Sequence, residues 1–237
     1  MRVLVTRPRP DADETAAELM VLGHEPVVAP LLEVTFEPGA TLDLSDTQAL
    51  LITSANGARA LALATERRDL AVFAVGAASA AAARQCGFEQ TESADGNVEA
   101  LANLVIARLA PQDGALVHVA GTVTAGDLSG RLAESGFDVR RVVLYEAHPV
   151  AELPEEIERH LEEDTLDAVM FYSPRTAAQF SELVAARGLA AHCSRIIALA
   201  LSEAVAEKLA LLGFSDTIVS ETPDQESLFR AMGAANT

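Results

Sequence analysis

The chain of 237 residues has no tryptophan, only two cysteines and a single lysine. Lys208, the lone lysine, lies beside a glutamate in a predicted helix, which argues against Schiff-base chemistry. Cys86 and Cys193 lie in apolar or helical surroundings, typical of free buried thiols in a reducing cytosol. No apolar run reaches the ~18 residues of a membrane span, and the N-terminus does not resemble a signal peptide. We therefore expect a cytoplasmic protein without disulfides.

The motifs of the common metal, nucleotide and nucleophile sites are also missing. The five histidines show no metal-ligand spacing, and there is no glycine-rich phosphate loop, G-x-G-x-x-G fingerprint or G-x-S-x-G elbow. A net charge of −18, without any basic cluster longer than two arginines, argues against nucleic acid as a partner. We expect no cofactor, and a site in which backbone amides and hydroxyl groups hold an anionic ligand.

What the chain does contain is an internal repeat with a long period. The matching segments are 49–58 with 168–177, 72–79 with 198–205, 97–101 with 224–228, and 3–5 with 116–118. A period this long is not that of a solenoid. It predicts two similar α/β lobes with a cleft between them.

Short β-rich segments alternate with alanine-rich segments of helical length, which predicts β-α-β units and parallel sheets. The strands read as continuous apolar runs, as expected when helices cover both faces of a sheet. Gly23, Gly87, Gly136 and Gly213 stand where left-handed helix caps need glycine. The predicted strands are 2–6, 26–29, 31–35, 48–53, 70–75, 115–119, 139–146, 167–172, 195–200 and 216–219. The predicted helices are 11–22, 55–65, 77–86, 97–109, 123–135, 154–163, 174–187, 202–212 and 224–232.

Two divisions of the chain into lobes are open at this point. The repeat alone places a boundary near residue 112. The polar or proline-bearing segments 36–47 and 147–154, each of which follows a strand-like segment, indicate another division. On that division the chain leaves the first lobe near residue 36 and returns near residue 148, and two extended strands connect the lobes.

The candidate site residues lie where a predicted strand ends and a helix begins. Open α/β sheets bind ligands there, because exposed amides and the helix dipole point to that edge. Thr53, Ser54 and Ser173 have this placement, although helix capping alone would also explain them. Gly76 and Ser202 occupy matching positions in the two lobes, where a small residue permits close backbone approach.

Four longer side chains can each be interpreted either as a site residue or as an ordinary surface residue. Arg7 and Arg175 could bind a carboxylate or phosphate, or be solvated surface arginines. Tyr145 and Tyr172 each close a predicted strand, and each could be a sheet-edge aromatic with its hydroxyl in water. Tyr172 has the worse placing for a cleft.

Several short segments, none of them specific alone, form a pattern through their order and spacing. They are Val5-Thr6-Arg7-Pro8, the segment 52–57, Ala74-Val75-Gly76 with Gly87, the segment 96–101, Val143-Leu144-Tyr145, Phe171-Tyr172-Ser173-Pro174 and Glu221-Thr222-Pro223. This pattern resembles the uroporphyrinogen-III synthase family over essentially the whole chain. The resemblance implies two flavodoxin-like (Rossmann-like) α/β domains joined by a two-stranded β ladder. Domain 1 would be discontinuous, from residues 1–35 and 149–237, and domain 2 would be residues 36–148.

The resemblance also implies an activity, that of a lyase in tetrapyrrole biosynthesis that needs no metal or cofactor. Its substrate, the linear tetrapyrrole hydroxymethylbilane, is cyclised to uroporphyrinogen III with inversion of the last pyrrole ring through a spirocyclic intermediate. Because the substrate can close by itself to the uninverted isomer, positioning is the main task. Tyr145 aligns with the tyrosine proposed as general acid in the family. The residues expected to bind substrate in the interlobe cleft are Arg7, Thr53, Ser54, Gly76, Asn97, Ser173, Ser202 and Thr222.

Departures from the family pattern leave some contacts open. Ser202-Glu203-Ala204-Val205 stands where the family often has Gly-Pro-Thr-Thr, and the loop 121–124 lacks an arginine common there. Since the substrate is rich in carboxylates, we expect the acidic residues to lie away from the site and helix N-termini to bind the substrate. We expect a monomer that contacts the preceding pathway enzyme transiently. The alternatives are a bilobal module that binds a tetrapyrrole or small anion without turnover, and a tandem receiver-like regulator, which would need clustered acidic residues at the strand ends.

Overall fold

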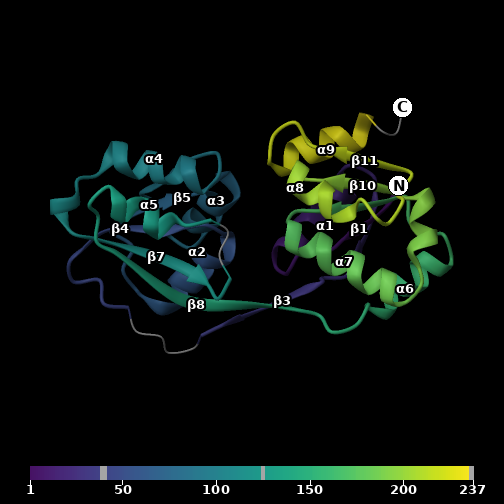
Figure 1. Ribbon diagram of the computed structural model, residues 1–237, viewed down its shortest axis with the longest axis horizontal. Helices are drawn as coiled ribbons and strands as arrows, with labels where there is room; N and C mark the ends of the chain where they lie inside the picture. Colours follow the sequence, from purple (N-terminus) through teal and green to yellow (C-terminus); the bar gives the residue numbers. More distant parts are fainter. Residues whose placement is uncertain (38–41, 124–125, 235–237) are drawn as a thin grey trace. The chain divides into compact units, whose positions relative to one another are not determined.

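The computed structural model describes residues 1–37, 42–123 and 126–234. The chain divides into two units (Figure 1). Unit 1 consists of Met1–Glu33 and His148–Thr237, and unit 2 is Val34–Ala147. The chain passes from unit 1 into unit 2 within one strand, β3 (Leu32–Phe36), and returns within another, β8 (Val139–Pro149).

Unit 1 is a five-stranded parallel sheet with helices on both faces. Along the sheet the strands are β11 (Asp216–Val219), β10 (Ile197–Ala200), β9 (Ala168–Phe171), β1 (Arg2–Val5) and β2 (Glu25–Val28). Its helices are α1 (Asp11–Val21), α6 (Glu155–Glu162), α7 (Pro174–Ala186), α8 (Glu203–Ala206) and α9 (Gln225–Ala234), with 3₁₀ turns η2 (Ala190–Arg195) and η3 (Glu207–Leu209).

Both faces of this sheet are buried, which explains why its strands are apolar at consecutive positions. Val3 and Val5 of β1 pack in one cluster with Leu19 of α1 and Leu228 of α9. Leu4 between them points to the opposite face and packs in the cluster that contains residues of α6, α7 and α8. Alternate side chains of each strand therefore enter two different cores.

Unit 2 has the same three-layer construction around a six-stranded sheet. Along the sheet the strands are β3, β8, β7 (Ala115–Gly121), β4 (Thr47–Ile52), β5 (Ala71–Ala74) and β6 (Thr91–Ser93). Helices α2 (Ala55–Ala64) and α3 (Ala77–Gln85) cover one face, while α4 (Val98–Arg108) and α5 (Leu128–Glu134) cover the other; η1 (Pro111–Asp113) precedes β7. The five strands from β8 to β6 are parallel.

Strand β3 runs antiparallel to β8 at the edge of the unit 2 sheet. The amide of Glu37 donates to the Leu144 carbonyl (2.9 Å), and the amide of Val150 donates to the Leu31 carbonyl (3.1 Å). As residue numbers rise in one strand they fall in the other, so the two strands form an antiparallel pair.

The two sheets share one strand order, which explains the internal repeat. Unit 1 reads β2-β1-β9-β10-β11 and unit 2 reads β8-β7-β4-β5-β6, so β1 corresponds to β7 and β9 to β4. If the strands are numbered along unit 1, the order is 2-1-3-4-5, that of flavodoxin-like sheets. In unit 2 the chain forms β4, β5 and β6 before β7 and β8, whereas in unit 1 the equivalent strands β9, β10 and β11 come after β1 and β2. The predicted α/β class with parallel sheets is confirmed, and the repeated segments occupy equivalent strands and helices.

Three local predictions were wrong. The helix expected over 123–135 begins at Leu128, because Gly126 has a left-handed φ of 75° and the Asp127 side chain accepts from the Gly130 amide (2.9 Å); residues 124–125 lie outside the described part. The helix expected over 202–212 ends early, at Leu209, because the short α8 continues as the 3₁₀ turn η3, and 3₁₀ runs are short. Strand β6 was missed because Thr-Glu-Ser has no apolar signal.

Smaller features of the sequence agree with the structure, with one exception. The four predicted cap glycines all have positive φ. Both cysteines are free, but only Cys193 is fully buried, whereas Cys86 is half-buried. Burial raises the pKa of the Cys193 thiol to about 11, which keeps it protonated at neutral pH. Within the described ranges, no helix combines the length and apolar character needed to cross a membrane.

Candidate active site at the carboxyl ends of the strands

In a sheet of order 2-1-3-4-5, ligands bind beyond the carboxyl ends of the first and third strands, at the switch point where the strand order reverses. In unit 1 this point lies between β1 and β9, and in unit 2 between β7 and β4. Arg7 and Ser173 follow β1 and β9, while Thr53 and Ser54 follow β4. Each unit thus brings predicted site residues to its own switch point.

In unit 2 the switch point holds a hydrogen-bonded pair, Ser54 and Tyr145. Ser54 is the N-cap of α2, and its Oγ accepts from the Gly57 amide at 3.0 Å. The same Oγ lies 2.7 Å from the Tyr145 hydroxyl, which β8 supplies from the other side of β7. Tyr145 is only 9% exposed, so the interpretation of a sheet-edge tyrosine with its hydroxyl in water was wrong. The capping interpretation of Ser54 is confirmed, and it coexists with the Tyr145 contact.

Gly121 at the end of β7 makes room for the Tyr145 ring. The β7–β8 register shifts between Ala120 and Gly121, which places Gly121 opposite Tyr145. A Cβ atom added to Gly121 would lie 2.8 Å from Cε2 and 2.9 Å from Cζ of the tyrosine. Sequence reasoning missed this requirement, because neither the bulge nor the cross-strand pairing can be read from the residues around Gly121.

We expect Gly121→Ala to displace the Tyr145 ring and to separate its hydroxyl from Ser54. Overpacking of this kind should cost about 1–2 kcal/mol of unfolding free energy, and turnover should fall about 10-fold because positioning is lost. Chemical denaturation and steady-state rates measure the two effects. Gly233→Ala is the matched control, because a Cβ there meets nothing within 4 Å. An alanine variant at Gly121 with normal turnover would show that the ring position does not matter.

Two further predicted residues of unit 2 lie beyond the switch point, after β5 and β6. Gly76 is the N-cap of α3 in an extended conformation, and a Cβ there would meet nothing within 4 Å, so a small side chain would be accommodated. Asn97 caps α4, and its side-chain oxygen accepts from the Ala100 amide at 3.0 Å. Thr53 is half-buried beside Ser54. A substrate contact by any of these three stays a prediction.

In unit 1 the guanidinium of Arg7 is held by side chains of its own unit. Nη2 lies 3.2 Å from a carboxylate oxygen of Asp11, and Nη1 lies 3.3 Å from Thr15 Oγ1 and 3.0 Å from Gln225 Oε1. The side chain is 17% exposed, so the alternative of a solvated surface arginine was wrong. The Arg7 guanidinium also lies over the Tyr172 ring, 4.2 Å from its centroid, a cation–π contact.

Tyr172 differs from Tyr145 in its surroundings. Its hydroxyl donates to Gln225 Oε1 at 3.1 Å, so the expectation of a hydroxyl in water was wrong here as well. Burial raises the pKa of Tyr172 to about 12, although the neighbouring Arg7 opposes the shift. Tyr172 therefore stays protonated at neutral pH and acts as a donor inside unit 1.

The remaining predicted residues of unit 1 lie at helix starts. Ser173 caps α7, with its Oγ accepting from the Thr176 amide at 3.1 Å, so capping is confirmed here too. Ser202 precedes α8 without a side-chain capping bond. Thr222 is exposed, and its amide donates to Ser227 Oγ at 3.2 Å. A side-chain hydrogen bond from Thr222 also lowers the pKa of Asp224, so Ser202 is the one of these three without a local side-chain capping role.

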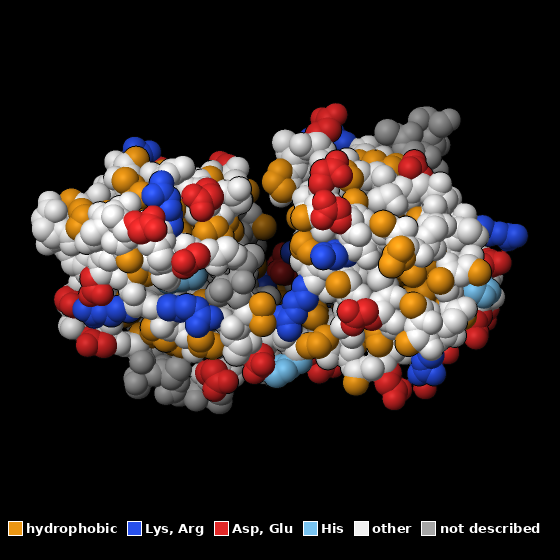
Figure 2. Space-filling view, viewed as in Figure 1, with side chains coloured by type: hydrophobic (Ala, Val, Ile, Leu, Met, Phe, Trp, Pro, Cys, Tyr) orange, Lys and Arg blue, Asp and Glu red, His pale blue; other side chains and the backbone are white. Residues whose placement is uncertain are grey.

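Acidic and basic side chains are interspersed on the face shown in Figure 2. Several acidic residues are paired with arginines: Asp46 precedes β4, at the amino end of the sheet, and lies 2.6 Å from Arg140. A side-chain hydrogen bond from Arg140 holds the pKa of Asp46 below its ordinary value. Glu92 of β6 is paired in the same way with Arg108, at 2.8 Å. Some of the negative charge is therefore neutralised locally by ion pairs.

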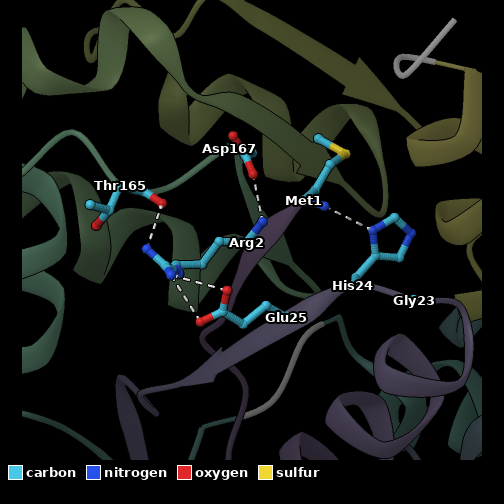
Figure 3. Close-up of a pocket in the computed structure, with 7 residues that line it drawn as sticks. All are labelled: Met1, Arg2, Gly23, His24, Glu25, Thr165 and Asp167. Carbon is cyan, nitrogen blue, oxygen red and sulfur yellow. Dashed lines mark hydrogen bonds and ion pairs between the residues drawn. The ribbon is translucent and has the colours of Figure 1, made fainter.

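An open pocket of about 460 Å³ lies at the other end of the unit 1 sheet (Figure 3). Its lining comes from Met1 and the first residue of β1, Arg2, from Gly23, His24 and Glu25 around the start of β2, and from Thr165 and Asp167 before β9. The lining groups bind one another: Arg2 pairs with Glu25 (2.9 Å), and the Arg2 amide donates to Asp167. Because this is the amino end of parallel strands, the pocket is not the expected ligand site.

Comparison with known proteins decides the family. The family model described as uroporphyrinogen-III synthase HemD matches residues 13–230, nearly the whole chain. The chain belongs to the uroporphyrinogen-III synthase family. No curated protein matches the sequence.

Two solved structures share the fold. One is uroporphyrinogen-III synthetase from Helicobacter pylori, with a TM-score of 0.65 and 15% identity over 99% of this chain and 100% of that one. The other is a mutant uroporphyrinogen III synthase from Thermus thermophilus, with a TM-score of 0.58 and 22% identity over 100% of this chain and 98% of that one. At these identities the likeness concerns the fold, and the family match identifies the chain as an enzyme, a cyclase of tetrapyrrole biosynthesis acting on hydroxymethylbilane.

Proposed function

We propose that this enzyme converts hydroxymethylbilane to uroporphyrinogen III with inversion of ring D, and that Tyr145 and Ser54 act together on the leaving hydroxyl group. The observation that supports this is the 2.7 Å contact between the two hydroxyls at the switch point of unit 2. A tyrosine hydroxyl held at a ligand-binding edge is suited to donate a proton at a defined position.

The hydrogen bonds around Ser54 favour one direction for the proton. The Gly57 amide donates to Ser54 Oγ, and an oxygen that accepts one bond becomes a better donor in the next. With the Ser54 O–H donating to the Tyr145 oxygen, the phenol proton is free to point at the substrate. After the transfer, the same serine bond stabilises the phenolate.

The proton completes the departure of the substrate hydroxyl as water and leaves an electron-deficient azafulvene stabilised by its pyrrole nitrogen. The substituted carbon of the terminal ring then attacks this azafulvene to form a spirocyclic pyrrolenine, which fragments and recloses with ring D inverted. Reclosure at the free α-carbon of ring D releases the proton of that carbon, which restores the Tyr145 hydroxyl. General acid catalysis contributes ~10²–10⁴-fold at most, so positioning of the terminal ring has to decide the isomer.

We assign the positioning of the substrate to the loops that follow the strands in both units. The proposed binding residues are Arg7, Thr53, Ser54, Gly76, Asn97, Ser173, Ser202 and Thr222, with backbone amides at the starts of α2, α3 and α7 as carboxylate donors. Helix N-termini attract anions locally, which makes such binding compatible with a net charge of −18. We further propose a cytoplasmic monomer that contacts the preceding enzyme of the pathway transiently.

The test is incubation with freshly generated hydroxymethylbilane, followed by oxidation and chromatographic separation of type I and type III porphyrins. We expect type III to dominate with the enzyme and type I without it. If the product mixture matches the protein-free control while a porphyrin still binds, the protein is a tetrapyrrole-binding module without turnover.

A further inference from the structure

The side-chain amide of Gln225, at the first turn of α9, has its oxygen fixed by three groups from distant parts of unit 1. Oε1 lies 3.0 Å from Arg7 Nη1, 2.9 Å from Thr15 Oγ1 and 3.1 Å from the Tyr172 hydroxyl. These partners come from the loop after β1, from α1, and from the end of β9. An amide held by three partners has little freedom to rotate.

The chemistry of the partners settles which atom of the amide faces them. Arg7 Nη1 can only donate, so the atom beside it has to be the acceptor oxygen, and an amide nitrogen there would set donor against donor. Tyr172, protonated because burial raises its pKa to about 12, donates to the same oxygen. The amide nitrogen Nε2 is therefore on the opposite side of the group.

Nε2 has no acceptor among the residues that the structure describes, and Gln225 is only partly buried. The network that fixes Oε1 joins the residues that follow β1 and β9, which is the switch point of unit 1. A fixed amide donor at that edge is matched to a carboxylate or carbonyl oxygen of a ligand. Arg7, by contrast, uses three of its five N–H donors on Asp11, Thr15 and Gln225.

We propose that Gln225 is a substrate-binding residue, whose Nε2 donates to a side-chain carboxylate of the tetrapyrrole, and that Arg7 and Tyr172 are positioning residues that orient it. This inference rests on the proposed function for the identity of the ligand. The proposal adds Gln225 as a direct hydrogen-bond donor in unit 1. Arg7 then contributes to binding indirectly, by orienting Gln225, in addition to the direct contact proposed for it above.

Gln225→Glu separates a binding role from a structural one. The glutamate keeps an oxygen where Oε1 accepts from Arg7, Thr15 and Tyr172, so the network and the fold should persist. The second oxygen replaces the Nε2 donor with a negative charge facing the substrate carboxylate. Loss of a charge-assisted bond, together with this repulsion, should raise the Kd for uroporphyrin III, the stable oxidised form of the product, about 10-fold or more. KM for hydroxymethylbilane should rise similarly, with kcat changed less than about 3-fold.

Gln112→Glu is the matched control, because Gln112 is exposed in η1, before β7 and so at the amino end of its sheet. It introduces the same charge and should leave the Kd and KM unchanged. If Gln225→Glu folds poorly in a thermal melt, Gln225→Met replaces it: methionine keeps the side-chain length, has no donor and leaves Arg7, Thr15 and Tyr172 only a weak sulfur acceptor. In a Gln225→Met variant that melts like the wild type, uroporphyrin binding should weaken about 3- to 10-fold, and unchanged binding would overturn the role of Gln225.

The two proposals fail in different ways. Fluorescence titration with uroporphyrin III reports on Gln225 even if the wild-type enzyme yields no excess of type III product, which would refute the proposed function alone. Wild-type affinity in a folded Gln225→Glu variant would overturn the role of Gln225. If Gln112→Glu weakens uroporphyrin binding as much as Gln225→Glu does, the effect comes from net charge, and the proposed role of Gln225 is overturned as well.

Discussion

Replacing Tyr145 with phenylalanine should lower turnover by about 10- to 100-fold, while type III stays the dominant product. The loss is partial because the leaving hydroxyl is already activated by the pyrrole nitrogen, and water or a substrate carboxylate can supply a proton. This range lies at or below the lower end of general-acid effects. Affinity for uroporphyrin III should change little, since the hydroxyl acts mainly in the transition state.

The geometry around Tyr145 indicates that Tyr145→Phe removes only the hydrogen bond to Ser54. Ser54 Oγ keeps its bond from the Gly57 amide when the phenol oxygen is removed, so no capping bond of α2 is lost. The unfolding free energy should therefore fall by only about 1 kcal/mol, the value of one hydrogen bond. Wild-type turnover in Tyr145→Phe would assign the residue to packing. A switch to type I product would make it a positioning residue, and either result would end the general-acid proposal.

The second large effect is expected at acidic pH and comes from His118 in the middle of β7. The side chain is 3% exposed; its Nδ1 lies 3.5 Å from Ser129 Oγ, and its Nε2 is buried without a partner in the described part of the chain. Burial lowers the pKa of His118 to about 4, and the positive charge of Arg141 adds to the shift.

A histidine whose pKa is lower in the folded state than in the unfolded state destabilises the fold as the pH falls. Above the unfolded value of 6.5, both states are neutral at His118 and the group has no effect. Between pH 6.5 and about 4 the unfolded state binds a proton that the folded state does not, so stability falls with pH. Below about pH 4 the loss is complete, at about 3 kcal/mol for a shift of this size.

His118→Leu isolates this effect, because leucine fills similar space without a titratable group. Urea denaturation from pH 4 to 8 should show a shallower decline for His118→Leu between pH 6.5 and 4 than for the wild type. His24, whose pKa burial also lowers, remains in both proteins and cancels in the comparison. Parallel pH profiles would show that His118 is hydrated or paired in solution.

Much of the fold could be predicted from local patterns in the sequence. Continuous apolar strands, glycine caps such as Gly87 and Gly136, and N-caps such as Ser54 and Ser173 follow from nearest-neighbour physics. The internal repeat predicted two similar α/β halves, because equivalent elements need equivalent residues. The exceptions were the polar strand β6, the tight η3 turn and the start of α5.

The sequence by itself therefore determined the α/β class, the repeat and the family, since each depends on residue types and their order along the chain. The tertiary structure decided which side chains meet. Ser54 and Tyr145 are 91 positions apart, and Arg7 and Gln225 are 218 apart. Their contacts depend on strand order, on the register shift at Gly121 and on helix placement, which only packing of the whole unit sets. The same physics buried His118 and fixed the orientation of the Gln225 amide.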